Sequence, residues 1–98
     1  MRSSIHQTID HEPGLTEFMR RVYHVIATIP RGSVMTYAQV ACAIGKPKAV
    51  RAVGNALNRN PFAPAVPCHR VVRSDGTIGG FASGAAMKRR LLRKEGAL

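Results

Sequence analysis

The chain has 98 residues, of which 45% are hydrophobic and 20% are charged. This size and composition suit one compact globular domain and exclude a disordered chain, and no apolar run reaches the roughly 18 residues that span a bilayer. Lys and Arg number 15 against 5 Asp and Glu, which gives a formal charge of +10. So strong a positive field on a small domain predicts a polyanionic partner.

The two cysteines, Cys42 and Cys68, lie far apart and form neither a disulfide framework nor a paired metal-binding motif. We expect free thiols in a reducing, intracellular compartment, and neither a metal nor a cofactor, because the histidines show no ligand spacing. Residues 1–14 are polar, end in Pro-Gly and show no signal peptide, so they predict a short tail or linker before a single domain over residues 15–98.

The distribution of charge says more than its total. No carboxylate occurs between Glu17 and Asp75. A basic surface that serves only solubility usually carries interspersed acids, whereas unpaired cations suit phosphates, so we predict a nucleic acid as the partner. The basic residues of this interval are Arg20, Arg21, Arg31, Lys46, Lys48, Arg51, Arg59, Arg70 and Arg73.

Apolar residues from Leu15 to Ile29 recur at helical spacing and predict a first amphipathic helix. Its exposed side would carry Arg20, Arg21 and His24, and we expect a surface or phosphate-contacting role for His24. Farther along, Thr36 and Gln39 match a capping box, so a second helix is predicted from Thr36 to Gly45. Cys42 lies in this helix among apolar neighbours and is expected in the core.

Pro47 favours the first turn of a third helix. Its predicted core stripe is Val50, Val53 and Leu57. Its opposite, polar face would hold Arg51, Asn55, Asn58 and Arg59. Two short helices joined by a tight turn that contains glycine, the second with a basic face, predict a helix-turn-helix.

Three prolines exclude regular helix over residues 60–67, so an extended loop should lead to Cys68. Val71 and Val72 predict a very short strand, and a glycine-rich loop over residues 79–84 precedes a last helix over residues 85–95. Its inward residues would be Met87, Leu91 and Leu92, and its basic residues are Lys88, Arg89, Arg90, Arg93 and Lys94. The fold class we predict is mostly α, a single small domain with a winged helix-turn-helix-like core and very short strands.

The stretch PAVPCHRVV, residues 64–72, places Cys68 beside His69 and Arg70. A thiol becomes nucleophilic as its thiolate, which a nearby base or positive charge favours. Neighbouring side chains on an extended strand point to opposite sides, however, so contact between Cys68 and His69 requires a turn or a bridging water. A free cysteine is also often a small buried residue, and these residues alone leave both interpretations open.

The order of motifs is more specific than any one of them. TYAQVA, KAVRAVGNAL, an RNP step, PCHRVV, a Gly/Ser loop and a basic helix ending in LLRKEG follow one another from residue 15 to residue 96. This order resembles the C-terminal domain of the O6-alkylguanine-DNA alkyltransferases. The resemblance implies a repair protein that binds duplex DNA through the minor groove, flips an alkylated guanine out of the stack and transfers the alkyl group, once, to its own cysteine.

The resemblance also implies roles for individual residues. Cys68 matches the alkyl acceptor, His69 the base that acts through a water, and Glu95 the carboxylate that orients this histidine. Arg51 matches the arginine that fills the gap left by the flipped base, and Tyr37 the tyrosine that crowds the target phosphate. Further expected contacts to DNA are Ser74 and Lys46, and the expected lesion pocket comprises Met35, Asn60, Phe81 and Ser83, with Asn60 at a hinge before the active site.

The sequence departs from the family pattern at Phe81, where a tyrosine is usual, at Ala38, where a glutamine is common, and at Lys46, where an asparagine is common. The family's N-terminal domain is also missing, which gives the chain the length of the alkyltransferase-like proteins. Those proteins bind the same lesions and flag them for excision repair without transfer, but they replace the acceptor cysteine.

Two further readings stay open: the non-catalytic lesion-binding protein, with excision-repair partners, and a winged-helix regulator if only the helix-turn-helix is considered. We expect a monomer that binds no membrane and works with the DNA, in the cytoplasm of a prokaryote or the nucleus of a eukaryote.

Overall fold

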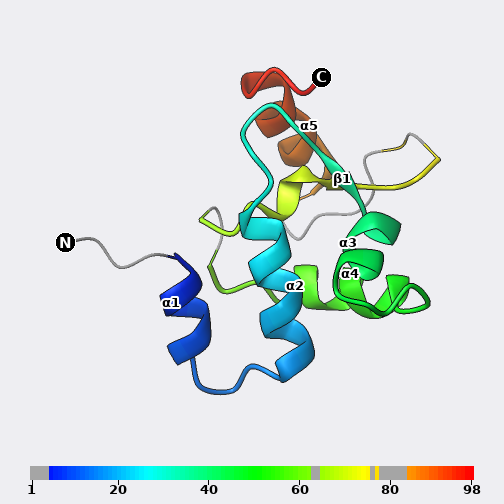
Figure 1. The fold of residues 1–98 in the computed structure, drawn as a ribbon. Helices are drawn as coiled ribbons and strands as arrows, with labels where there is room; N and C mark the ends of the chain where they lie inside the picture. Colours follow the sequence, from blue (N-terminus) through cyan, green and yellow to red (C-terminus); the bar gives the residue numbers. More distant parts are fainter. Residues whose placement is uncertain (1–4, 63–64, 76, 78–83) are drawn as a thin grey trace.

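The computed structural model describes residues 5–62, 65–75, 77 and 84–98. The described part is mostly helical, as the sequence predicts, with one very small sheet (Figure 1). In chain order its elements are α1 (Ile5–His11), α2 (Glu17–Ala27), β1 (Met35–Thr36), α3 (Tyr37–Ala43), α4 (Val50–Asn58), the 3-10 helix η1 (Cys68–Arg70), β2 (Val71–Val72) and α5 (Ala85–Lys94). None of the helices in these ranges is long and apolar enough to cross a bilayer.

Part of the segment that the sequence predicts as a tail is a helix. α1 lies along α2 (Figure 1), with the side chain of Ile9 fully buried and Ile5 packed against the core. The only apolar side chains in α1 are these two isoleucines, one helical turn apart. So short an apolar pattern cannot be told from a polar tail until α2 supplies the surface that it covers.

The predicted helix-turn-helix is formed by α3 and α4, which pack against each other and against α2. Both halves of the capping box are present: Gln39 N donates to Thr36 Oγ1 over 3.0 Å, and Thr36 N donates to Gln39 Oε1 over 2.8 Å. Gly45 follows α3 with φ of 77°, a conformation that favours glycine. The capping chemistry therefore sets both ends of α3 as the sequence predicts.

Three predictions in this region are wrong. Cys42 is exposed, because Val40 and Ala41 form the buried side of α3 and the next residue turns away from it. α4 begins at Val50 and not at Pro47, since residues 47 and 48 form a separate turn that Ala49 N closes by donating to Lys46 O. Val50, placed at this helix start, is 39% exposed instead of belonging to the core stripe.

The predicted strand at Val71 and Val72 is present and pairs in parallel with β1, so that Met35 lies opposite Val71 and Thr36 opposite Val72. This pairing brings the start of α3 next to the segment that contains Cys68. α5 follows the loop outside the described residues and packs against η1. Its inner side is not as predicted: Leu92 is buried, but Met87 is 38% exposed and the basic residue Lys88 is fully buried.

Candidate active site

Cys68 begins the 3-10 helix η1, directly after Pro67. The turn that a contact between Cys68 and His69 would need is therefore present: Arg70 N donates to Pro67 O over 2.9 Å, and Cys68 N donates to Val66 O over 2.9 Å. The thiol is free and the residue is 8% exposed. Cys68 is thus nearly enclosed, next to a sheet that joins it to the helix-turn-helix.

His69 is 3% exposed and faces the far end of α5. Its Nε2 lies 3.0 Å from Oε2 of Glu95, an ion-pair distance, although the ring N–H is not aligned well enough for a regular hydrogen bond. The structure therefore brings together two of the residues that the resemblance links, 26 positions apart in the chain. Glu95 is the residue that caps α5, and its side chain is 9% exposed.

Arg70 holds the same carboxylate. Its Nε donates to Oε1 of Glu95 over 2.9 Å and its Nη2 donates to Oε2 over 2.7 Å. The bidentate contact with the Arg70 guanidinium lowers the pKa of Glu95 to about 2, against the opposing effect of burial, so this carboxyl group is ionised at neutral pH. A third donor, Nη1, reaches Ile29 O over 2.8 Å.

The positive charge near the thiol comes from Lys88, a residue to which the sequence assigns no role. Lys88 is fully buried in α5, its Nζ donates to Tyr37 Oη over 3.5 Å, and it lies 5.6 Å from the centre of the Tyr37 ring. Burial lowers the pKa of Lys88 to about 8, and the charge of Cys68 acts in the opposite direction. Burial likewise raises the pKa of Tyr37. Lys88, Tyr37 and Cys68 therefore interact electrostatically.

Asn60 ties down the loop that leads to Cys68. Its Nδ2 donates to Val66 O over 2.8 Å, and its Oδ1 accepts from Phe62 N over 2.8 Å. The prolines of this loop keep it out of helical geometry, and the amide side chain supplies hydrogen bonds that a helix would otherwise provide. Asn60 thus links the end of α4 to the loop before Cys68.

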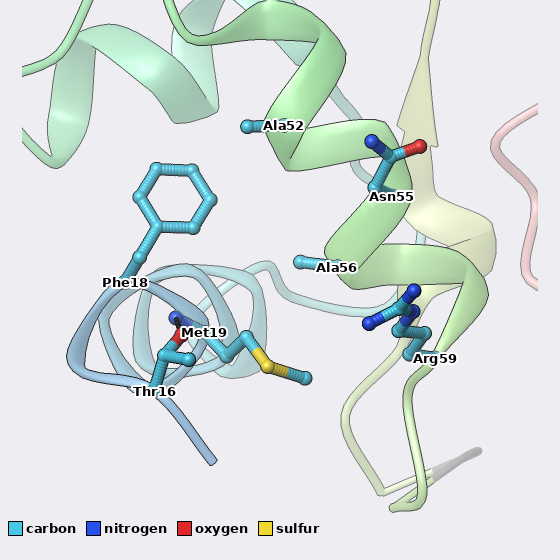
Figure 2. Close-up of a pocket in the computed structure, with 7 residues that line it drawn as sticks. All are labelled: Thr16, Phe18, Met19, Ala52, Asn55, Ala56 and Arg59. Carbon is cyan, nitrogen blue, oxygen red and sulfur yellow. Dashed lines mark hydrogen bonds between the residues drawn. The ribbon is translucent and has the colours of Figure 1, made fainter.

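A second region of interest is the outer face of α4, where Arg51, Asn55, Asn58 and Arg59 are all exposed as predicted. Figure 2 shows Ala52 and Ala56 on the side of this helix that faces Phe18 and Met19 of α2; with Thr16, Asn55 and Arg59 these residues line a cavity of about 250 Å³. The lining contains no residue of the Cys68 surroundings.

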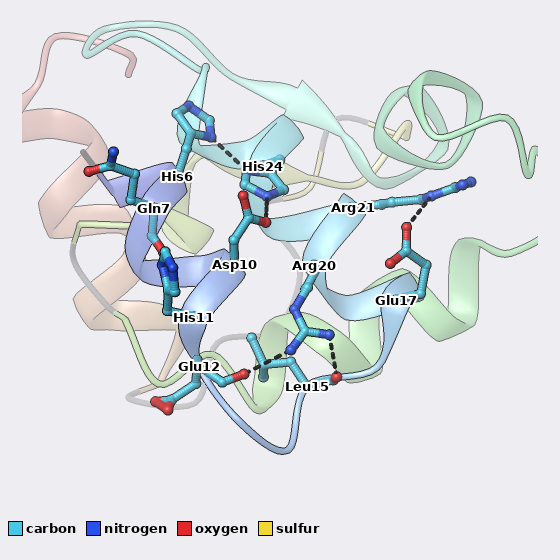
Figure 3. A network of polar contacts seen from close by, with 10 residues as sticks. All are labelled: His6, Gln7, Asp10, His11, Glu12, Leu15, Glu17, Arg20, Arg21 and His24. Carbon is cyan, nitrogen blue, oxygen red and sulfur yellow. Dashed lines mark hydrogen bonds and ion pairs between the residues drawn. The ribbon is translucent and has the colours of Figure 1, made fainter. Parts of the chain in front are cut away.

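Several basic residues of the acid-free interval are not available for phosphates. Arg20 donates to Leu15 O over 2.8 Å and to Glu12 O over 2.9 Å, so it fastens the loop between α1 and α2 (Figure 3). Arg21 pairs with Glu17 at 3.2 Å. His24, predicted as a surface residue, is half-buried between its neighbours.

Two residues of α1 hold His24. Its Nε2 lies 2.7 Å from Asp10 Oδ1, and its Nδ1 lies 2.6 Å from Nδ1 of His6. These contacts (Figure 3) could not be foreseen while residues 1–14 were expected to be a tail.

The remaining predicted site residues are scattered. Lys46 and Ser74 are exposed, and Met35 is half-buried in β1. Phe81 and Ser83, expected in the lesion pocket, lie outside the described residues. Where residues are described, no group of three or more His, Cys, Asp or Glu side chains is placed to hold a metal ion.

The chain was compared with known proteins. Residues 17–97 match the family described as 6-O-methylguanine DNA methyltransferase, DNA binding domain. A methylated-DNA--protein-cysteine methyltransferase of Methanothermobacter thermautotrophicus is 51% identical over 83 residues, which are 85% of this chain and 46% of that protein. A protein of the same name from Salmonella typhimurium is 46% identical over 93% of this chain and 53% of its own length. The chain spans about half the length of these curated relatives.

Solved structures agree. OGT of Mycobacterium tuberculosis in complex with DNA superposes with a TM-score of 0.81 at 44% identity, over 83% of this chain and 49% of that one. Atl1 of S. pombe, in complex with damaged DNA containing O6-carboxymethylguanine, superposes with a TM-score of 0.74 at 36% identity, over 84% of this chain and 78% of that one. By the extent and identity of these matches, the chain belongs to the O6-methylguanine-DNA methyltransferase family, through that family's DNA-binding domain.

Proposed function

We propose that this protein repairs DNA directly, by moving an alkyl group from O6 of a guanine in duplex DNA to the Sγ of Cys68. The observation that carries the proposal is the enclosed Cys68 at the start of η1, followed by His69, whose Nε2 lies 3.0 Å from the ionised carboxylate of Glu95. A buried base held by a carboxylate, beside a thiol, is an arrangement that activates a nucleophile.

The reaction follows from this arrangement. With Nε2 of His69 turned to Glu95, Nδ1 is the ring nitrogen left to accept the thiol proton, through a water if the two do not touch. The anionic Glu95 then stabilises the imidazolium, and the ammonium of Lys88 stabilises the thiolate. The thiolate forms an S–C bond to the alkyl carbon as the C–O6 bond breaks, and the bonding electrons leave with guanine, which takes up a proton. The thioether is stable, so each molecule reacts once.

Access to the base requires that it leave the stack. Unstacking costs a few kcal/mol, which contacts to the phosphates and a side chain inserted into the gap must offset. We assign the insertion to Arg51 on the exposed face of α4, entering from the minor groove, and phosphate contacts to Tyr37, Lys46 and Ser74. In this proposal the lesion pocket comprises Met35, Asn60, Phe81 and Ser83. The protein would act as a monomer wherever the DNA is, in the cytoplasm of a prokaryote or the nucleus of a eukaryote.

One observation favours a second function. Atl1 of S. pombe, solved in complex with damaged DNA containing O6-carboxymethylguanine, superposes on this chain with a TM-score of 0.74 at 36% identity. A protein of this kind would bind alkylated guanine without transfer and mark it for excision repair. The presence of Cys68 beside His69, with the ionised Glu95 next to that histidine, argues for transfer, because a protein that only binds has no need of an activated thiol.

One mass measurement distinguishes alkyl transfer from binding without transfer. The protein is incubated with a duplex that contains O6-methylguanine, and its peptides are weighed. Transfer predicts that the peptide containing Cys68 gains one methyl group and that the lesion disappears in a one-to-one ratio. Binding without transfer predicts an unchanged peptide and an intact lesion. The control is Cys68→Ala, which should bind the duplex and leave the lesion in place.

A further inference from the structure

Each nitrogen of the Arg70 guanidinium donates a hydrogen bond among the described residues, and none of these three bonds is to the thiol. Two of its nitrogens bind the two oxygens of Glu95, and the third donates to Ile29 O over 2.8 Å. The side chain is 16% exposed. A cation directly after the Cys-His pair could stabilise a thiolate. The guanidinium of Arg70 instead donates to α5 and to the segment after α2, so it holds these segments in place.

We propose that Arg70 is a positioning residue: it holds the carboxylate of Glu95 ionised and turned toward Nε2 of His69, and thereby keeps the proton of this pair on the imidazole. This inference rests on the proposed function for its meaning, since the His69–Glu95 pair is what activates Cys68. The geometry on which it stands does not depend on that function.

The first step of the argument is that Glu95 needs an external support. It caps α5, one residue before Gly96, at a point where a helix end is free to fray. His69 alone would hold one oxygen in a poorly aligned contact. The paired hydrogen bonds from Nε and Nη2 of Arg70 fix the plane of the carboxylate, and so fix the direction in which Oε2 faces the imidazole.

The second step is that Arg70 itself is anchored to a third segment. Its Nη1 is bonded to Ile29 O, at the end of α2, and the turn that follows packs on the same end of α5. In that turn, a Cβ on Gly32 would lie only 3.2 Å from Glu95 O, and Arg31 Nη2 donates to Lys94 O over 3.3 Å. Arg70 therefore joins η1, α5 and the chain leading into β1.

The third step concerns the proton. Among the described residues, the titratable side chains that contact the Glu95 carboxylate are Arg70 and His69, both from η1, while Arg31 approaches only the backbone of Lys94. The hydrogen bonds from Arg70 are the main cause that lowers the pKa of Glu95 to about 2. An ionised carboxylate facing Nε2 accepts from a ring N–H at that nitrogen, and this tautomer leaves Nδ1 as the base. Without Arg70, burial would raise the pKa of Glu95.

Carboxyl titration tests this without DNA. The chain has three glutamates, Glu12, Glu17 and Glu95, so protein labelled with carbon-13 at Glu Cδ gives one carboxyl signal for each. In the wild type the Glu95 signal should stay in its ionised position down to acid pH. In Arg70→Met it should titrate about 1–3 pH units higher, the range over which a neighbouring arginine shifts a carboxyl pKa. Arg70→Lys, which keeps the charge and loses the bidentate contact, should fall between them.

The reactivity of Cys68 gives the second readout. It is measured in a Cys42→Ser background, because the exposed thiol would react too, by the rate of modification with iodoacetamide from pH 4 to 9. Arg70→Met should slow the reaction and move its acid limb upward in pH together with the Glu95 titration. The matched control is Arg31→Met, which removes a contact to the same end of α5 without touching the carboxylate, and it should leave the profile in place.

A purely structural role for Arg70 would lower the rate by the same factor at every pH and leave the Glu95 titration unmoved, and either result overturns the proposal. If Arg70→Met does not fold, as judged by near-UV circular dichroism, Arg70→Lys decides by the same two readouts. Failure of the wild type to take a methyl group from DNA would refute the proposed function and leave this test valid.

Discussion

Replacing Lys88 by methionine should stabilise the folded protein while impairing its chemistry. Lys88 is fully buried, and burial lowers its pKa from 10.5 to about 8. One pKa unit corresponds to about 1.36 kcal/mol, so holding this ammonium charged in the fold costs about 3 kcal/mol near pH 7. Methionine has a similar length and no charge to desolvate. Allowing about 1 kcal/mol for the lost hydrogen bond to Tyr37, we expect a net gain of about 2 kcal/mol in the free energy of unfolding.

The pH dependence separates this reasoning from a simple packing effect. Between pH 8 and 10.5 the unfolded chain binds the Lys88 proton and the folded protein has lost it, so wild-type stability should rise with pH across this window. Urea unfolding of both proteins at several pH values should therefore give a difference that is largest at pH 7 and shrinks toward pH 10. A variant less stable than the wild type at pH 7, with a difference that does not change with pH, would refute the argument. Slower modification of Cys68 by iodoacetamide in the variant is expected as well, because the thiolate loses its counter-charge.

Two further predictions concern the exposed helix and the loop. Arg51→Ala should slow transfer from duplex DNA, while the rate at which Cys68 reacts with iodoacetamide stays the same. The control Arg59→Ala also removes a cation from the outer face of α4, and it should weaken DNA binding without this selective loss of transfer. If Arg51→Ala slowed transfer and the iodoacetamide reaction equally, the insertion role would be contradicted. Asn60→Ala should lower the free energy of unfolding by about 1–3 kcal/mol in urea, because Phe62 N loses its partner and Val66 O keeps only the hydrogen bond from Cys68 N. Asn58→Ala, at an exposed position, should change it little. An equal effect of the two alanines would show that the hydrogen bonds of Asn60 do not stabilise the loop.

Local chemistry made much of this fold predictable. A capping box needs only a side chain and an amide three residues apart, so the start of α3 is readable from Thr36 and Gln39. The same holds for Gly45 at the end of α3 and for the polar stripe of α4. α1 was not predictable because its stability depends on burying Ile9 against α2, and the sequence does not show that contact. Cys42 was misplaced since its apolar neighbours do not reveal which side of a seven-residue helix faces the core.

The residues of the candidate site likewise fall into those that the sequence identifies and those that only the tertiary structure reveals. Residues 68–70 can be recognised in the sequence as candidate site residues from their side-chain chemistry, and the resemblance to the family pointed to Glu95. Periodicity placed Lys88 next to Met87 on a basic helix and gave no sign that the lysine would be the buried one. Its burial depends on tertiary contacts, such as the hydrogen bond that the ammonium donates to the Tyr37 hydroxyl. The sequence identifies Arg70 as a cation, but it does not show that Arg70 pairs with Glu95, which lies 25 positions farther along the chain.

Because acidic residues are few, the basic residues of α4 can attract phosphates while a single carboxylate serves the proposed site at Cys68. Three of the five carboxylates are engaged locally: Asp10 with His24, Glu17 with Arg21, and Asp75 with Thr77. None of these lies on α4 or in the turn before it, so the cations there keep their full attraction for phosphates. The proposed mechanism nevertheless needs one negative charge beside His69. Glu95 supplies it from the end of α5, where Arg70 neutralises it and burial hides it from the surface. A carboxylate exposed near α4 would repel DNA, whereas one that is buried and paired with arginine can orient a base at little electrostatic cost to binding.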